Sequence, residues 1–209
     1  MTNAKRKFDK TILRCKEQVQ LYEHLKTVQD EHPEIDINIS QDILRGAIVL
    51  AVAAFDAYAT DCFGEMFVPY IKKRGVDEAL MELLDKAGFN IKFAIELIGA
   101  ERPYRKIRTL IEKYYATYTT QRLRVIDELF VQFHIKRITE NAEQKSGRKI
   151  LLKSVEKIIQ RRHSIVHDGD YNEFNRIKEV TLSDLKRIDD LVILVSNMED
   201  IVQNKFRFI

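Results

Sequence analysis

Residues 161–170, with the sequence RRHSIVHDGD, combine side chains that can move protons with side chains that can hold anions. A histidine titrates near neutral pH, whereas an arginine stays charged and binds phosphate or carboxylate groups in a fixed fork. On a helix, His163 and His167 would lie within about 40° of each other, but Arg162 and His167 would lie about 140° apart. A single site that uses both Arg162 and His167 therefore requires that the helix end at His167 or that a second chain contribute.

Arg162 is the unusual member of this segment, because it interrupts an apolar stripe. The stripe follows one face of a helix and consists of Val155, Ile158, Ile159, Ile165 and Val166. A guanidinium keeps its charge at ordinary pH and is costly to bury alone, so we expect a partner or ligand for Arg162. Asp56 is the best candidate partner, because it is an acid within an apolar helix, where a lone charge would be equally costly.

The order of these residues resembles the motif of the HEPN family, which has an Arg, a polar residue, a short run of other residues and then a His. Residues 162–167 read RHSIVH, that is R-x4-H with His163 in the polar position. A DGD turn follows, as in family members whose motif reads like RNxIVHxG. The resemblance extends to an early long helix, GAIVLAVAAFDAYATDCF, which is expected to pack against the motif helix.

This resemblance implies a metal-independent endoribonuclease that needs no cofactor and acts as a homodimer, with two motif helices facing each other around one composite site. It implies that His167 acts as acid or base, that Arg162 stabilises the phosphate and that His163 orients or polarises. Attack of a ribose 2′-hydroxyl on the adjacent phosphate needs proton transfer and stabilisation of negative charge, which suits these residue types. Asp56, as the partner of Arg162, completes the expected catalytic set.

The same resemblance suggests a biological setting, because family members often cut cellular RNA as toxins or in antiviral defence. The expected partners are RNA and, for a toxin, an antitoxin protein. A noncatalytic helical module that uses the motif helix for dimerisation or RNA binding is the alternative, and the intact Arg162 and His167 argue against it. A DNA-binding regulator is a third interpretation, but the sequence has no clear helix-turn-helix with a basic recognition helix.

A metal site is a competing interpretation of the histidines. His163 and His167 are four residues apart, which matches a site with two imidazole ligands, but such a site needs further ligands. Asp168 and Asp170 could supply them, yet acids that follow a helix are more often turn residues. The chain also has no HExxH, P-loop, GxGxxG or GxSxG pattern. We therefore expect no metal.

Positive charge is concentrated in two segments, although the formal net charge is only +3. Residues 145–167 contain seven Lys or Arg against Glu156 alone. Four of these share the motif helix and are expected to bind RNA: Lys149, Lys153, Lys157 and Arg161. Residues 101–124 contain seven Lys or Arg, two acids and interleaved tyrosines, which suits base stacking and phosphate binding. Amphipathic helices routinely have this composition, so an ordinary surface helix is the preferred interpretation of that segment.

The chain is expected to form one all-α domain, residues 1–209. Its apolar fraction of 45% supports a core, and its seven Gly and three Pro are few interruptions for long helices. The resemblance refines this to an up-and-down helical bundle of the HEPN type with additional short helices. The segment 41–67 is apolar around most of its circumference, so it is expected to be the central, most buried helix.

Periodicity and breakers predict the individual elements. Helices are expected at about 4–30, from a Ser40 cap to about 67, at 77–88, 90–99, 104–118, 123–138 and 151–167, and from Thr181 onward, where Asp184 completes a capping box. Interruptions are expected at His32-Pro33, between Pro69 and Gly75, near Thr119-Thr120 and at Ser146-Gly147.

The compartment follows from the cysteines and from the apolar segments. Cys15 and Cys62 have no CxxC partner and are expected to be reduced thiols. The first residues lack the apolar core of a signal peptide, and the most apolar segment, 46–55, is shorter than the about 20 residues that a membrane span needs. We therefore expect a cytoplasmic protein with no membrane partner.

Overall fold

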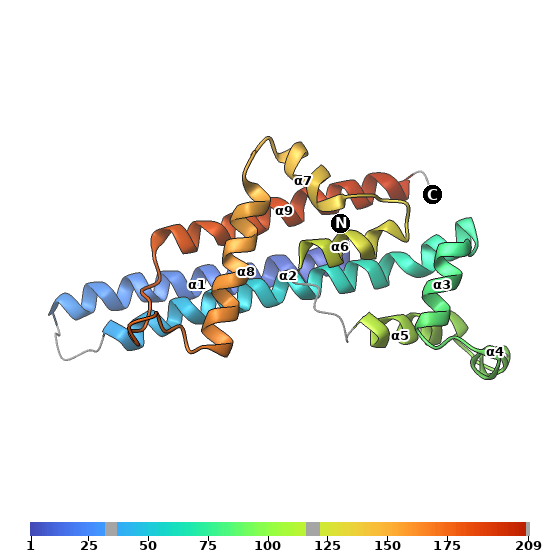
Figure 1. The fold of residues 1–209 in the computed structure, drawn as a ribbon, viewed down its shortest axis with the longest axis horizontal. Coiled ribbons are helices and arrows are strands. Elements are labelled where there is room, and N and C mark those ends of the chain that lie inside the picture. The colour runs from blue at the N-terminus through green and yellow to red at the C-terminus, as the bar shows by residue number, and fades with distance from the viewer. Residues whose placement is uncertain (32–36, 116–121, 208–209) are drawn as a thin grey trace.

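The computed structural model describes residues 1–31, 37–115 and 122–207, and in these ranges the chain is all-α (Figure 1). The helices are α1 (Asn3–Glu31), α2 (Ile37–Arg74), α3 (Glu78–Lys86), α4 (Ile91–Ile98), α5 (Pro103–Tyr115), α6 (Leu123–Val131), α7 (Ile138–Ser146), α8 (Leu151–His167) and α9 (Leu182–Arg207). The β-type pairing in the described residues is an isolated antiparallel bridge between Tyr171 and Ile177. The predicted all-α class is confirmed.

Three long helices, α1, α2 and α9, run along the long axis of the molecule, and α8 crosses them (Figure 1). Helix α1 packs along α2, and α8 contacts both α2 and α9. The short helices α3, α4 and α5 lie near the end of α2 that reaches Arg74 (Figure 1). The late helix that carries the R-x4-H stretch therefore does pack against the early long helix, as the sequence predicts.

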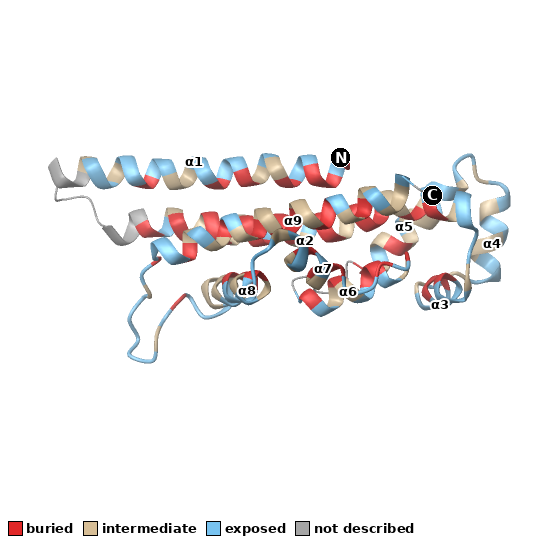
Figure 2. Cartoon of the chain, turned by 90° about the horizontal axis from the view of Figure 1, so that it is seen from above, coloured by how far each residue is buried: buried red, intermediate tan, exposed pale blue. Residues whose placement is uncertain are grey.

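Helix α2 is the central helix of the fold. Its buried apolar side chains are Leu44, Ala47, Ile48, Ala51, Val52, Ala54, Phe55, Tyr58, Ala59, Cys62, Phe63, Phe67 and Tyr70. A helix that is apolar around most of its circumference must be covered on several sides. Helices α1, α5, α8 and α9 all pack against α2, and Figure 2 shows α1 and α8 on opposite sides of it. The predicted central position is confirmed.

Helix α2 is also long and apolar enough to cross a membrane by length and composition alone. Residues Gln41–Arg74 cover 34 residues and include a stretch with a mean hydropathy of 1.6. The expectation that the apolar segment is too short for a span is therefore wrong, because the apolar helix extends beyond residues 46–55. In the structure 56% of that stretch is buried inside the protein, and the core helix of a protein meets the same criteria.

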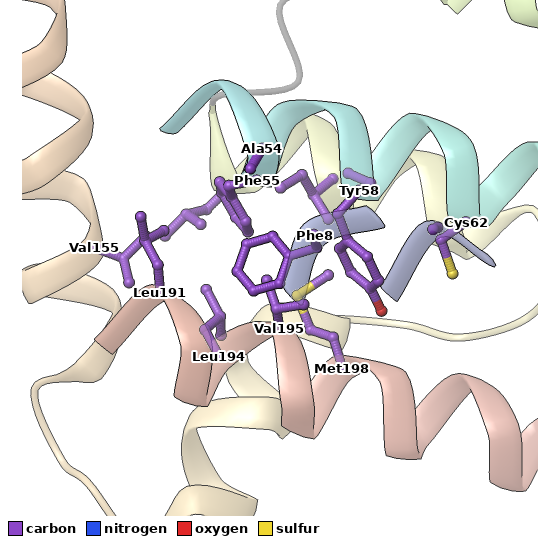
Figure 3. Close-up of a cluster of buried hydrophobic side chains, with 14 of the residues drawn as sticks. Phe8, Ala54, Phe55, Tyr58, Cys62, Val155, Leu191, Leu194, Val195 and Met198 are labelled. Carbon is purple, nitrogen blue, oxygen red and sulfur yellow. The ribbon is translucent and has the colours of Figure 1, made fainter. Parts of the chain in front are cut away.

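The core where α1, α2, α8 and α9 meet is built around three aromatic side chains (Figure 3). The rings of Phe8, from α1, and Tyr58, from α2, lie 6.0 Å apart between centroids, and Phe55 packs in the same cluster. Val155 of α8 lies beside Leu191 of α9 (Figure 3). Burying each large apolar side chain contributes about 1.5–3 kcal/mol. Helix α8 is therefore fixed by core packing.

Both ends of α2 differ from the prediction. The helix begins at Ile37, so Ser40 lies within it and is not its cap. The helix then continues through Pro69 and ends just before Gly75, which has a left-handed φ of 78°. Proline removes one backbone donor from a helix, but Pro69 is exposed while Tyr70 beside it is buried. Burial of the surrounding helix outweighs the local preference of proline.

The predicted helix at 123–138 is divided into α6 and α7. The backbone turns at His134 and Arg137, whose φ angles of 56° and 53° are left-handed. The division places Phe133, which is completely buried, in the core. The prediction of one continuous helix is therefore wrong. The interruptions predicted at His32-Pro33 and near Thr119-Thr120 lie outside the described residues.

The other predicted elements lie where they are expected. Gly147, with a φ of 72°, ends α7. The capping box at the start of α9 is present: the Thr181 amide donates to Asp184 Oδ2 at 3.0 Å, and the Asp184 amide donates to Thr181 Oγ1 at 3.3 Å. The stripe predicted for α9 is largely buried and includes Ile188, Leu191, Val195, Met198 and Val202.

Candidate active site

Helix α8 carries the R-x4-H residues, and its bounds agree with the predicted 151–167. Its N-terminal half is held in the core by Leu151, Val155 and Ile158. The C-terminal half turns outward, because Ile159 and Ile165 are only partly buried and Val166 is 47% exposed. The prediction that Val166 belongs to the buried stripe is therefore wrong. Helix α8 thus leaves the core near the residues that could do chemistry.

His163 and His167 lie together on the last turn of α8, and both are exposed. Their ring centroids are 4.4 Å apart, and the rings are inclined at 40°. The helical-wheel expectation for this pair is confirmed. Since α8 ends at His167, one of the two conditions that would allow a site to use both Arg162 and His167 is met. Two accessible imidazoles at a helix end can exchange protons with a bound ligand.

The turn after α8 has a closely defined backbone. The amides of Asp168 and Asp170 both donate to the carbonyl of Ser164, each at 3.0 Å. Gly169 has a left-handed φ of 63°, and a Cβ there would lie 3.1 Å from the ring of Tyr171. Both the backbone conformation and the contact with Tyr171 therefore favour glycine at this position. The turn fixes the end of the helix that presents His167.

The carboxylate of Asp170 anchors this turn to two helices. Asp170 is completely buried; Arg45 of α2 donates to its Oδ2 from Nε at 3.0 Å, and Nη2 of Arg161 lies 2.8 Å from the same oxygen. Both guanidinium groups also donate to the carbonyl of Lys178, at 2.6 and 3.1 Å. Charge-assisted bonds of this kind are strong and directional. The Asp170 network therefore ties α2, α8 and the segment after the turn to one another.

Sequence reasoning treated Asp170 as a turn residue and did not single out Arg45. The available signal was the one that identified Asp56, namely a charge within the apolar helix. Arg45 is 8% exposed, and its partner Asp170 is 125 residues away in sequence. A buried arginine indicates a buried acid, but only the packing of α8 on α2 shows which acid it is.

Arg162 and Asp56 are both partly buried, and they lie on helices that pack against each other. Each takes part in interactions within the structure. Arg162 is expected from the sequence to be buried, and it is partly buried. A direct ion pair between Arg162 and Asp56 stays a prediction, as do their catalytic roles.

The four residues expected to bind RNA have two kinds of environment. Lys153 and Lys157 are exposed on α8, whereas Lys149 is exposed in the turn before α8 begins at Leu151. The expectation that Lys149 shares the motif helix is therefore wrong. Arg161, in contrast, is turned inward to Asp170 and is 13% exposed in its side chain. The structure therefore gives Arg161 partners inside the chain, and its contact with RNA stays a prediction.

A groove of about 330 Å³ between α8 and α9 extends the basic surface of the motif helix. Lys153 and Lys157 line one wall, and Lys186 and Arg187 of α9 line the other. Arg187 is paired with Asp184, so the lysines supply most of the available charge. Sequence reasoning missed the α9 side, because 168–190 is acidic overall.

The described structure places no further metal ligands beside His163 and His167. His163 and His167 are close together, but the described residues contain no group of three or more His, Cys, Asp or Glu side chains that could hold an ion. Asp170, one of the two acids considered, is bound by Arg45 and Arg161. Asp168 is exposed on the other side of Gly169 in the same turn.

Comparison with known proteins gives one result for this chain. The RiboL-PSP-HEPN family model matches residues 11–204, which is nearly the whole of the 209-residue sequence. No curated protein and no solved structure matches the chain. HEPN domains are generally ribonucleases. The all-α arrangement, the crossing of α8 over α2 and the match over residues 11–204 together establish that this chain belongs to the RiboL-PSP-HEPN family.

Proposed function

We propose that this protein is a metal-independent endoribonuclease whose site is formed by the R-x4-H residues of α8 at a homodimer interface. The observation that carries the proposal is the exposed His163–His167 pair at the end of α8, with ring centroids 4.4 Å apart, in a chain that belongs to a HEPN family. The partly buried Arg162 lies one residue before His163 on the same helix.

The reaction is a transfer of the phosphate ester within the RNA. The ribose 2′-oxygen attacks the adjacent phosphorus, the bond to the 5′-oxygen breaks, and a 2′,3′-cyclic phosphate remains. One group must take the proton from the 2′-hydroxyl and another must protonate the leaving 5′-oxygen. His167 fills one of these roles, and in a dimer the second subunit supplies another His167. Arg162 neutralises the charge that develops on the phosphoryl oxygens, and His163 orients or polarises.

A homodimer would account for two features of α8: the different orientations of Arg162 and His167, and the exposure of Val166. Arg162 is turned partly inward while His167 is exposed, so the two side chains reach one phosphate more readily when two α8 helices face each other. Val166, on the same part of α8, adds an exposed apolar side chain that could contact the second α8 helix. Such side chains are favoured at the centre of subunit contacts.

The RNA approaches along basic surface next to the motif. Lys153 and Lys157 are exposed on α8, and Lys186 faces them across the α8–α9 groove. Lys149 is exposed in the turn just before α8. A row of cations on one surface raises the local concentration of a polyanion. We place the RNA strand along this groove on its way to His167.

The biological setting that fits this activity is a cytoplasmic toxin or an antiviral-defence nuclease that cuts cellular RNA. An antitoxin protein would then be a natural partner. Expression in a bacterial host tests this setting, because wild-type protein is expected to stop growth and the His167→Ala variant is not.

The deciding experiment uses purified protein with labelled structured RNA in excess EDTA, followed by end-group analysis of the fragments. The variants are His167→Ala and, as a matched control, His24→Ala, which removes an exposed histidine from α1. Wild-type protein and His24→Ala are expected to leave 2′,3′-cyclic phosphate ends, whereas His167→Ala loses about 10²–10⁴-fold in rate, the usual contribution of a general acid or base.

Two results would overturn the proposal. The first is equal cleavage by wild-type and His167→Ala protein. The second is a folded wild-type protein that leaves a broad panel of RNAs intact, which would favour the noncatalytic RNA-binding or interaction module. Circular dichroism of each variant establishes that folding is unchanged.

A further inference from the structure

A second basic surface lies between α4 and α5, away from the R-x4-H residues. An open cleft of about 570 Å³ separates these helices, and its lining includes Arg102, Arg105, Lys106 and Lys113. Helix α5 turns its other face toward α2, where Ile111 is buried. The face of α5 that bears the cations is therefore the one left open to solvent.

The four cations of this cleft have no ion-pair partner within the described part of the chain, and all four are exposed. The contrast with the rest of α5 is clear, because Arg108 is bonded to Glu112 at 2.6 Å. Two acids, Glu96 and Glu101, also line the cleft, so its lining carries an excess of two positive charges. Like charges gathered without partners repel one another, and an anionic ligand would relieve that repulsion.

The spacing of the cations suits an extended polyanion. Arg102 and Lys113 are eleven residues apart, which corresponds to about 16 Å along a helix. Arg105 and Lys106 lie between them on the same wall. A row of this length can neutralise several successive phosphates of a single strand, which advances about 3.4 Å along its axis per nucleotide when the bases are stacked.

The opposite wall of the cleft offers an aromatic surface. Phe93 of α4 lines the cleft, and its ring packs edge-on against Phe89 with centroids 5.4 Å apart. The Asn90 side chain accepts from the Phe93 amide at 3.0 Å and so fixes the start of α4. An aromatic ring beside a basic row is the usual arrangement for single-stranded nucleic acid, in which bases stack and phosphates are bound.

The cleft lies within reach of the proposed active site along α2. Asp170, in the turn after α8, is anchored at Arg45, and α5 approaches α2 at Gly64, beside Glu112. These positions are 19 residues apart on one helix, about 28 Å. The C-terminal end of α8 and helix α5 both project below α2 in Figure 1. A strand of about eight stacked nucleotides would span that distance.

We propose that the α4–α5 cleft is a distal binding site for single-stranded RNA, which holds a substrate whose scissile bond lies at His167. This inference rests on the proposed ribonuclease function and adds a substrate preference to it. Arg102, Arg105, Lys106 and Lys113 bind phosphates, and Phe93 stacks a base. RNA long enough to reach both sites is bound more tightly than short RNA.

The test compares wild-type protein with the double variant Arg105→Gln/Lys106→Gln. The matched control is Lys10→Gln/Arg14→Gln, which removes two exposed charges that have no ion-pair partner among the described residues, from α1, a helix that does not line the cleft. Binding is measured by fluorescence anisotropy with a 2′-O-methyl RNA of about twelve nucleotides, which cannot be cleaved, over a range of salt concentrations. Cleavage is measured with the matching ribo-oligonucleotide and with a tetranucleotide.

The cleft variant is expected to bind the long RNA roughly tenfold more weakly at low salt. The slope of log affinity against log salt should become shallower by about 1.4, since each lost phosphate contact on a single strand removes about 0.7. Its KM for the long substrate should rise with kcat unchanged, and cleavage of the tetranucleotide should stay at the wild-type rate. The α1 control should behave as wild type.

The outcomes separate the cleft from the active site. Unchanged long-RNA binding in the cleft variant overturns the inference, even if cleavage still depends on His167, and leaves an acidic protein segment as the occupant to test. Cleft-dependent RNA binding without any cleavage overturns the proposed nuclease and retains the distal site. Failure of wild-type protein to bind either RNA overturns both.

Discussion

Asp168 and Asp170 show how strongly environment separates two identical side chains in one turn. Asp170 is completely buried between two guanidinium groups, whereas Asp168 is exposed. Removing one partner from a buried ion pair costs about 3–5 kcal/mol, because the remaining charges stay buried. The Asp170→Asn variant should therefore lose about that much free energy of unfolding, measured by urea titration. Asp168→Asn should change it by less than about 0.5 kcal/mol; equal effects of the two changes would contradict this assignment.

At the residue scale the sequence was most informative where geometry is local. The contact of His163 with His167 follows from the repeat of one helix, so it could be predicted without any knowledge of the fold. The partner of Asp170 could not, because Arg45 comes from another helix and meets Asp170 only after α8 packs on α2. The orientation of Arg161 toward Asp170 depends on the same packing.

At the scale of elements, Pro69 is the clearest case of local preference overruled by packing. It lies inside α2, is exposed and leaves one helical carbonyl without its usual donor. Because proline costs up to about 3 kcal/mol relative to alanine inside a helix, Pro69→Ala should raise the free energy of unfolding by about 1–3 kcal/mol in thermal or urea unfolding. Pro103→Ala is the control, since Pro103 is the first residue of α5, where proline is favoured. A loss of stability in Pro69→Ala would mean that the packing of α2 needs the proline.

Element boundaries could be predicted where a breaker and the packing agree. Gly147 and the Thr181–Asp184 box mark real helix ends, and both were evident in the sequence. The break at His134 and Arg137 was not, because neither residue is a breaker. It arises from the need to bury Phe133, which is a tertiary requirement.

At the scale of the whole molecule, the two cysteines report on the integrity of the core. Cys15 and Cys62 are both completely buried and free. Burial raises the pKa of the Cys15 thiol from 9.0 to about 11, and burial together with nearby Glu199 raises the pKa of Cys62 further. Both thiols should resist alkylation at pH 8 in the native protein and react rapidly in urea. A Cys15→Ala variant assigns the two rates, and rapid native labelling of Cys62 would show that the core opens.

The same pKa shifts predict how stability depends on pH. The folded-state pKa of each thiol lies above its unfolded value, so the contribution to stability is fully present below about pH 9. As the pH rises through about 11, Cys15 is expected to lose that contribution. Urea unfolding between pH 8 and pH 11 should therefore show falling stability, and Cys15→Ala should show a smaller fall.

The surfaces of the molecule were the least accessible to sequence analysis. Lys157 and Lys186, from different helices, line the α8–α9 groove, and Phe93 and Lys113 likewise line the α4–α5 cleft. Composition identified both basic segments, but a solvated helix and a ligand-binding helix have the same composition. Only the relative placement of the helices shows which cations lie unpaired beside an open cleft.

Dimerisation is the property that depends on the molecule as a whole, and Val166 offers the sharpest test of it. Val166 comes directly before His167 in sequence and is 47% exposed, so a glutamate there should cost one isolated chain little. If two α8 helices face each other in the active form, however, Val166→Glu buries two like charges at the interface and should separate the subunits. Light scattering should then show a monomer, and RNA cleavage should fall with the dimer fraction. Ile98→Glu, which changes an isoleucine that is 87% exposed on α4, should leave both unchanged; full activity of a monomeric Val166→Glu protein would show that one chain holds a complete site.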